Sequence, residues 1–153
     1  MNGTEPLVRR GRFADASAIL ALAARFAETR VEWRTYDEVI AGTERALRAA
    51  LESASADHAI FVAEENGAFA GFVFVDSETD FFTGAQHAHI SEIAVVRDGS
   101  GCGRSLMVAA EAWAAERGSR YVSLHVTAKN ARARALYERL GYQLEHSRLI
   151  KLF

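Results

Sequence analysis

Apolar residues in the first half of the chain predict a short strand, two helices and a hairpin. Residues 14–28 repeat apolar side chains at helical spacing. A second helix is expected to open at Thr35, where Glu38 completes a capping box three residues later. Asn66-Gly67 separates two β-rich segments, and this dipeptide favours a tight hairpin turn. The strands of this half are expected at residues 6–12, 59–63 and 69–75.

The second half alternates strand and helix patterns. A glycine-rich segment follows an apolar strand and precedes a helix whose apolar residues gather on one side. Glycines placed after two of the helical patterns supply left-handed caps. The expected elements are a strand at residues 90–96, a helix ending at Gly118, a strand at 121–126, a helix from Asn130 to Leu140, and a last strand or hairpin in 142–153.

The resulting order is β-α-α-β-β-β-α-β-α-β, which predicts a mixed α+β domain around one sheet. The chain has 153 residues, half of them hydrophobic and a quarter charged. This length fits a single domain over residues 1–153, and the composition is that of a globular protein.

Charge and cysteine content narrow the classes of partner. The net charge of −2 leaves no basic footprint, so nucleic acid is not an expected partner. Cys102 is the single cysteine, which excludes an internal disulfide and favours a reducing compartment. The first residues lack an apolar signal segment, and no apolar run approaches the length of a membrane span. We therefore expect a soluble, cytoplasmic protein that has no membrane partner.

The segment Asp98-Gly99-Ser100-Gly101-Cys102-Gly103 joins a predicted strand to a predicted helix. Glycines let the backbone approach an anion, and free N–H groups and the dipole of the helix start favour negative charge. This arrangement predicts a phosphate site, although such turns are structural about as often. Neither the dinucleotide glycine pattern nor the nucleoside-triphosphate loop fits the segment. The candidate donors lie in Ser100, Gly101, Cys102, Gly103, Arg104 and Ser105.

Two segments together resemble the GNAT superfamily of N-acetyltransferases. The first is AVVRDGSGCGRSLM, residues 94–107. The second, residues 130–142, matches every fixed place of the signature N-x-x-A-x-x-L-Y-E-x-L-G-[FY]. The resemblance implies transfer of an acetyl group from acetyl-CoA to a primary amine of a small molecule or peptide. It also implies a single GNAT-like domain: a mostly antiparallel sheet with a parallel pair splayed around the cofactor groove, and helices on both faces.

The resemblance also implies roles for individual residues. Tyr137 would protonate the departing thiolate, although a half-buried aromatic on a helix is the plainer interpretation. Glu92 would be the base, acting through water, or else simply a solvent-facing strand carboxylate. Asn130 would contact the pantetheine arm of the cofactor, or only cap a helix. The main-chain groups of Ala94 and Val95 would pair with the pantetheine amides, and the glycine loop would bind the pyrophosphate.

One position departs from the family's loop. The family usually has Gln or Arg where this chain has Asp98, and the loop looks about two residues short. A carboxylate there would repel phosphate, so we expect Asp98 to face solvent or a helix N-terminus. Arg97 or Arg104 would then supply the missing donor.

The acceptor pocket is the least determined part of the site. The resemblance places it at Trp33, Tyr36, Phe81, Phe82 and His89. Ordinary core and loop aromatics are an equal interpretation. His87, His89 and His125 do not have the spacing of a metal site, so no metal is expected. A non-catalytic acyl-CoA-binding or sensing module and a plain interaction domain are the alternative functions. The apolar C-terminal strand suggests a homodimer.

Overall fold

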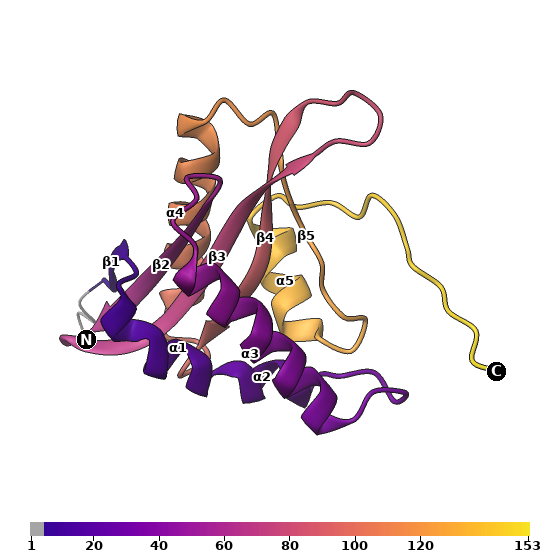
Figure 1. Ribbon diagram of the computed structural model, residues 1–153, viewed down its shortest axis with the longest axis horizontal. Helices are drawn as coiled ribbons and strands as arrows, with labels where there is room; N and C mark the ends of the chain where they lie inside the picture. The colour runs from indigo at the N-terminus through magenta and orange to yellow at the C-terminus, as the bar shows by residue number, and fades with distance from the viewer. Residues whose placement is uncertain (1–4) are drawn as a thin grey trace.

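The computed structural model describes residues 5–153, and its centre is a five-stranded sheet in the order β1-β2-β3-β4-β5 (Figure 1). The strands β1 to β4 pair antiparallel, whereas β4 and β5 pair parallel. This mixed sheet confirms the predicted fold class. The strands are β1 Leu7–Arg10, β2 His58–Glu65, β3 Ala68–Thr79, β4 Gln86–Val95 and β5 Val122–Leu124.

Helices cover both faces of the sheet. The N-terminal helices α1 to α3 lie across one face, and α4 and α5 pack on the other (Figure 1). Each face buries its own apolar cluster, so the sheet is the shared wall of two cores. The helices are α1 Ala16–Ala21, α2 Ala23–Glu28, α3 Tyr36–Glu52, α4 Cys102–Glu116 and α5 Ala131–Arg139, with a 3-10 turn at Phe13–Asp15.

Local sequence signals set most of the element ends. The Thr35 side chain accepts from the Glu38 N–H while Glu38 accepts from the Thr35 N–H, which confirms the capping box. Asn66 and Gly67 both have positive φ, as the predicted hairpin turn requires. The single helix predicted over residues 14–28 is divided instead. It breaks at Leu22, and the break turns Ile19, Ala23 and Ala27 into the core.

The parallel pair β4–β5 is short. Its register runs only from Ala88–Val122 to Ile90–Leu124. Beyond Ile90, β4 continues to Val95 along β3 alone. The two parallel strands therefore separate at this point, and a gap opens in the sheet beside the second half of β4.

A bulge lies at the same place. Phe74 pairs with Glu92 and Val75 with Ile90, so Ser91 is an extra residue in β4. Phe74 and Ala94 belong to the core under α1–α3, whereas Val75 and Ile90 belong to the core under α4. Because of the extra residue, Glu92 shares the α1–α3 face with His89, three positions earlier.

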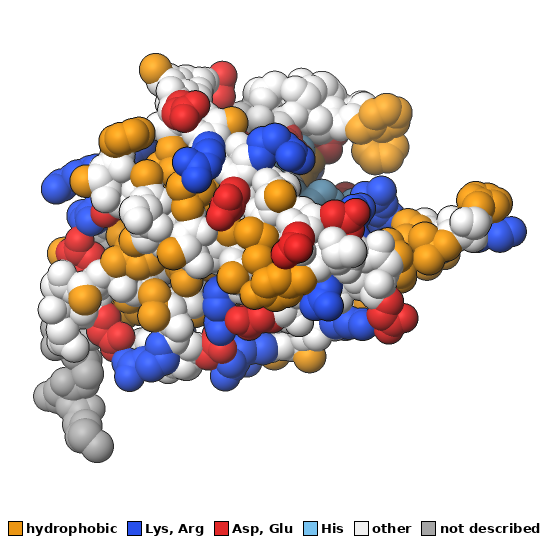
Figure 2. Space-filling model, turned by 60° about the horizontal axis from the view of Figure 1, so that its bottom comes forward, with side chains coloured by type: hydrophobic (Ala, Val, Ile, Leu, Met, Phe, Trp, Pro, Cys, Tyr) orange, Lys and Arg blue, Asp and Glu red, His pale blue; other side chains and the backbone are white. Residues whose placement is uncertain are grey.

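The C-terminal segment contradicts the sequence prediction. No strand forms in residues 142–153; the segment leaves the domain as an extended arm (Figures 1 and 2). The helix α5 ends as predicted at Gly141, where the Tyr142 N–H donates to the Tyr137 carbonyl. Alternation makes a segment suitable for a strand, but the described chain offers this arm no partner. The arm exposes Leu144, Leu149, Ile150, Leu152 and Phe153.

Candidate active site

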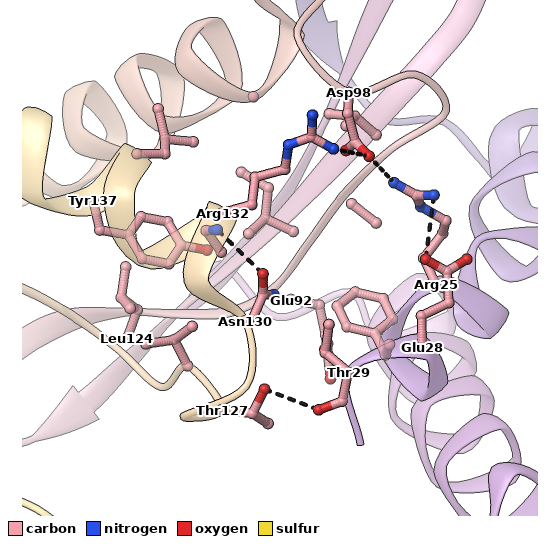
Figure 3. A pocket seen from close by; sticks show the side chains of 18 of the residues that line it. Arg25, Glu28, Thr29, Glu92, Asp98, Leu124, Thr127, Asn130, Arg132 and Tyr137 are labelled. Carbon is pink, nitrogen blue, oxygen red and sulfur yellow. Dashed lines mark hydrogen bonds and ion pairs between the residues drawn. The ribbon is translucent and has the colours of Figure 1, made fainter. Parts of the chain in front are cut away.

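A cleft of about 1070 Å³ opens where β4 and β5 separate (Figure 3). Its walls come from α2 and the following loop, the second half of β4, and the starts of α4 and α5. The cleft brings together most of the site residues predicted from the sequence. These are Glu92, Ala94, Val95, Ser100, Gly101, Gly103, Arg104, Asn130 and Tyr137.

Two predicted loop donors do not face this cleft. Cys102 is fully buried in the core under α4. The Ser105 N–H already donates to the Gly101 carbonyl at 3.1 Å, because this bond closes the first turn of α4. Neither group is therefore available to a ligand as predicted.

The glycine loop presents free donors at the start of α4. Gly99 and Gly101 have φ of 74° and 86°, a conformation that glycine adopts without a Cβ penalty. Among residues 5–153, no acceptor faces the N–H groups of Gly103 and Arg104. The 15-residue helix α4 adds its positive dipole end at the same point. The loop thus has the donors and the field of an anion site.

The position of Asp98 differs from the one predicted from the sequence. It faces neither bulk solvent nor a lone helix N-terminus, but bridges two arginines across the cleft (Figure 3). Its carboxylate lies 2.9 Å from Arg25 of α2 and 2.5 Å from Arg132 of α5. The hydrogen bond to Asp98 raises the pKa of the Arg25 guanidinium. No local sequence signal could have paired Asp98 with Arg25, 73 positions earlier, or with Arg132, 34 positions later.

A second contact joins the walls further along. The Thr127 hydroxyl, just after β5, donates to the Thr29 carbonyl at 3.1 Å (Figure 3). Lys129 forms an ion pair with Glu32 in the same region. Contacts at two points therefore set the distance between the α2 wall and the α5 wall.

The lining is strongly basic. The acidic groups in it are Glu28, Glu92 and Asp98. The basic groups are Arg25, Arg30, Arg34, Arg97, Arg104, Lys129, Arg132 and Arg139. The chain as a whole is slightly acidic, so this excess of cations is local and suits a polyanionic ligand.

Tyr137 projects from α5 into the cleft (Figure 3). It is 8% exposed and belongs to the core under α4. Burial raises the pKa of its phenol to about 12, so the hydroxyl keeps its proton throughout the neutral range. Asn130, seven residues earlier, accepts from the Ala133 N–H at 3.1 Å and so caps α5.

Glu92 enters the cleft from the opposite face of the sheet. Its neighbour Ala94 on that face is buried under α1–α3, as strand alternation predicted. Burial raises the pKa of the Glu92 carboxyl to about 7. Within residues 5–153 it has no hydrogen bond or ion pair that would offset this desolvation.

The main chain of β4 presents only alternate residues to the cleft. The Val96 N–H donates to Ala70 of β3, so the Val95 N–H points to the opposite edge, where the sheet opens. The Ala94 carbonyl lies against Gly71 of β3, where a Cβ would come within 2.6 Å of it. The main-chain groups of Ala94 therefore face β3 and cannot pair with a ligand in the cleft. Those of Ile93 and Val95 face the gap instead.

The family model of the acetyltransferase (GNAT) family matches residues 20–142, which span every wall of this cleft. The chain belongs to the GNAT family. It is 30% identical over 144 residues to the uncharacterized N-acetyltransferase YhfO of Bacillus subtilis, and the match covers 89% of each chain. As a member of this family it is an acetyltransferase, which the sequence resemblance had indicated.

Solved structures agree with the fold of this acetyltransferase. A putative acetyl transferase from Pyrococcus furiosus superposes with a TM-score of 0.78 at 27% identity, covering 97% of this chain and 100% of the other. The aminoglycoside N-acetyltransferase AAC(6')-Iy, solved in complex with CoA, has a TM-score of 0.71 at 18% identity, with 99% and 96% covered. At that lower identity the second likeness concerns the fold alone.

The predicted acceptor residues of the acetyltransferase are not gathered in the cleft. Trp33 and Tyr36 are 47% and 42% exposed beside α3 and do not line it. Phe81 and Phe82 stack edge-to-face at the tip of the β3–β4 loop, almost fully exposed. His89 is buried on the sheet, where its Nδ1 lies 2.8 Å from the Ser123 hydroxyl. Of the five, His89 alone lies on the strand that carries Glu92.

Two absences hold for the described part of the chain. Residues 5–153 contain no group of three His, Cys, Asp or Glu side chains placed to hold a metal ion. No helix in this range has both the length and the apolar character needed to cross a bilayer.

Proposed function

We propose that the chain transfers the acetyl group of acetyl-CoA to a primary amine in this cleft. One observation carries the proposal: the carboxyl of Glu92 and the phenol of Tyr137 enter one cleft from opposite faces of the sheet. The gap between β4 and β5 is the passage between those faces. An amine that arrives on the α1–α3 side meets a thioester held on the α5 side only there.

The residues around the gap suit coenzyme A. Its diphosphate would bind the free N–H groups of Gly103 and Arg104, with Arg104 and Arg132 within the basic lining. The pantetheine amides would pair with the exposed edge of β4 at Ile93 and Val95. The Val95 N–H is the donor we assign to the carbonyl oxygen as it gains negative charge. Asn130 keeps its role as helix cap at the edge of this path.

Glu92 is the proposed base. An alkyl amine has a pKa near 10.4, so only about one molecule in a few thousand is neutral at pH 7. The amine nitrogen must lose a proton as it bonds to the carbonyl carbon, and a carboxylate with a pKa of about 7 accepts it, directly or through one water. The same carboxyl at its usual pKa would be a weaker base by more than two units.

Tyr137 is the proposed donor to sulfur. As the carbon–sulfur bond breaks, the electron pair stays on sulfur, and the phenol supplies the hydrogen bond and proton. The balance is one amide and one free thiol for each thioester and amine consumed. The buried hydroxyl suits this role because it keeps its proton from about pH 7, where Glu92 becomes ionised, up to about pH 12.

We also propose that two copies associate through the C-terminal arm. The arm carries exposed apolar side chains, and within residues 5–153 no strand pairs with the outer edge of β5. If the arm of one copy paired with β5 of the other, the apolar side chains would be buried and the free edge of β5 would be hydrogen-bonded.

The test of function has two stages. Acetyl-CoA should raise the melting temperature, whereas NAD and ATP at equal concentration should not. Thiol release is then measured with amino acids, polyamines, aminoglycosides and peptides. Tyr137→Phe should lower kcat about 100-fold or more with little change in acetyl-CoA affinity. Binding without thiol release from any amine would show a sensing module instead, and absence of binding would overturn both.

A further inference from the structure

The sheet face that α1–α3 cover at one end is polar at the other, where no helix covers it (Figure 1). Past Phe74, which packs under α3, the strands β3 and β4 continue into a loop that no helix covers (Figure 1). Cross-strand register puts Asp76 opposite His89 and Glu78 opposite His87 on this face. Ser123 of β5 lies opposite His89. We call this surface the polar face; its residues are Asp76, Glu78, His87, His89, Ser91 and Ser123.

Among the described residues, the carboxylates of the polar face have histidines beside them but no Lys or Arg. Within residues 5–153, Asp76 and Glu78 form no ion pair with any Lys or Arg. Asp76 is half-buried, its pKa is raised by that burial, and it accepts one hydrogen bond, from Ser91 at 3.1 Å. Glu78 lies 3.7 Å from both His87 Nε2 and His89 Nδ1. Burial lowers the pKa of His89, so its ring stays neutral and does not cancel this charge.

His87 supplies a second, independent sign of a ligand. It is 7% exposed, and its Nδ1 is buried with no hydrogen-bond partner among the described residues. Its other ring nitrogen points toward Glu78 at 3.7 Å, longer than a hydrogen bond. Tyr121 stacks on the ring and donates its hydroxyl to Asp80, which fixes the imidazole from behind. A buried imidazole nitrogen without a partner is costly, which is unusual at a position that serves packing alone.

The polar face leads directly to Glu92. The bulge at Ser91 places Glu92 on the same side of the sheet as His89 and His87. From the Phe74–Glu92 pair, the rise of a strand puts Asp76 about 7 Å away and Glu78 about 13 Å away. Four cations of the cleft, Arg25, Arg97, Arg104 and Arg132, lie in or against the glycine loop at the opposite end of β4. Basic side chains therefore gather where the phosphates are expected to bind, and acidic side chains lie on the far side of the proposed base, Glu92.

We propose that the polar face is the acceptor site and that it binds amines carrying a second positive charge, the class of aliphatic diamines and polyamines. The reacting nitrogen lies at Glu92, and the distal ammonium lies between Asp76 and Glu78. This inference rests on the proposed function and adds the class of acceptor. A positive charge there neutralises carboxylates that no Lys or Arg of the described chain pairs with.

The experiment compares two acceptors of equal length, pentylamine and cadaverine, which differ in the distal ammonium alone. We expect kcat/KM for cadaverine to exceed that for pentylamine by about tenfold or more, the value of a charged hydrogen bond. Glu78→Gln should bring this ratio close to one. Glu78 is 47% exposed, so its replacement does not threaten the fold. Glu116→Gln, on the exposed side of α4, makes the same charge change and should keep the ratio.

Asp76→Asn is the second variant, read by the same ratio, with its melting temperature confirming that it folds. Equal efficiency for the two amines in the wild type would overturn the inference while leaving the acetyltransferase intact. A ratio that persists in both Glu78→Gln and Asp76→Asn would also overturn it. If no amine released thiol, the proposed function itself would have failed, and that outcome is separate.

Discussion

At the scale of single residues, Glu92 shows how activity and stability oppose each other in this fold. Its carboxyl has no polar partner among residues 5–153, and burial raises its pKa to about 7. The same desolvation that would suit the group to the proposed role of base makes its charged form costly in the folded protein. The side chain therefore fits poorly with a purely structural role.

The linked pH dependence can be worked out from this pKa. Folding raises the pKa of Glu92 from 4.5 to about 7, so the folded state binds the proton more tightly than the unfolded state. Glu92 therefore favours folding below about pH 4.5, and this contribution is lost as the pH rises through 7. Glu92→Gln, which stays neutral, should be roughly 1–3 kcal/mol more stable than the wild type at pH 8 and equal to it near pH 4.

Denaturant unfolding at the two pH values measures this difference. The activity of the same variant should fall, and its rate–pH profile should move to higher pH, since only the free amine's own ionisation remains. A stability gain that is equal at both pH values would show that the carboxyl does not titrate near 7. An unchanged rate profile would remove Glu92 as the base.

At the scale of elements, the loop between β4 and α4 also connects α2 and α5 through ion pairs. Asp98 holds Arg25 of α2 and Arg132 of α5, and Arg132 is one of the arginines that we propose for the diphosphate. Under that proposal the carboxylate and the phosphates would compete for the Arg132 guanidinium. The loop thus holds the two walls together, and its carboxylate would oppose the charge of the ligand.

Asp98→Asn removes this competitor. We expect the Kd for acetyl-CoA to fall about two- to fivefold, the value of a partly exposed ion pair, and Arg132→Gln to raise it. Isothermal titration at low and at physiological salt measures both changes, with Glu116→Gln as the charge-matched control. Weaker binding by Asp98→Asn would mean that the carboxylate positions the arginines for the ligand and does not compete with it.

Most elements, and about half of the site, could be predicted from sequence because their signals are local. Caps at Thr35 and Asn130 and the turn at Asn66-Gly67 depend on residues a few positions apart. Tyr137 and the glycine loop came from short segments that resemble a family. The bridge from Asp98 to Arg25 and the polar face depend on which strands and helices become neighbours. That information is tertiary, so periodicity and spacing could not reveal it.

At the scale of the whole molecule, the C-terminal arm is the feature that one chain does not explain. Its alternating pattern predicted a strand, yet the described domain gives it nothing to pair with. Phe153 and Leu149 are among the most exposed apolar side chains in the protein. An alternating pattern indicates that a segment suits a β-sheet. It does not indicate whether the sheet belongs to the same chain or to another copy.

Removal of residues 143–153 tests the proposed association. We expect the full chain to sediment as a dimer and the shortened chain as a monomer. The melting temperature of the shortened chain should depend less on protein concentration, because association no longer contributes to stability. A full chain that sediments as a monomer at every concentration would show that the arm serves another purpose.

The extra residue in β4 has a consequence for how this protein tolerates change. The side of the sheet on which Glu92 stands is set by its pairing with Phe74, and Ser91 before it has no partner in β3. Loss of Ser91 would therefore leave Ile90 opposite Val75 and Glu92 opposite Phe74, and the carboxylate would stay on the side of the imidazoles. Loss of a paired residue of β4 would instead turn the side chains on one side of the deletion to the opposite face. Ser91 is thus the position in this strand where a deletion keeps the register.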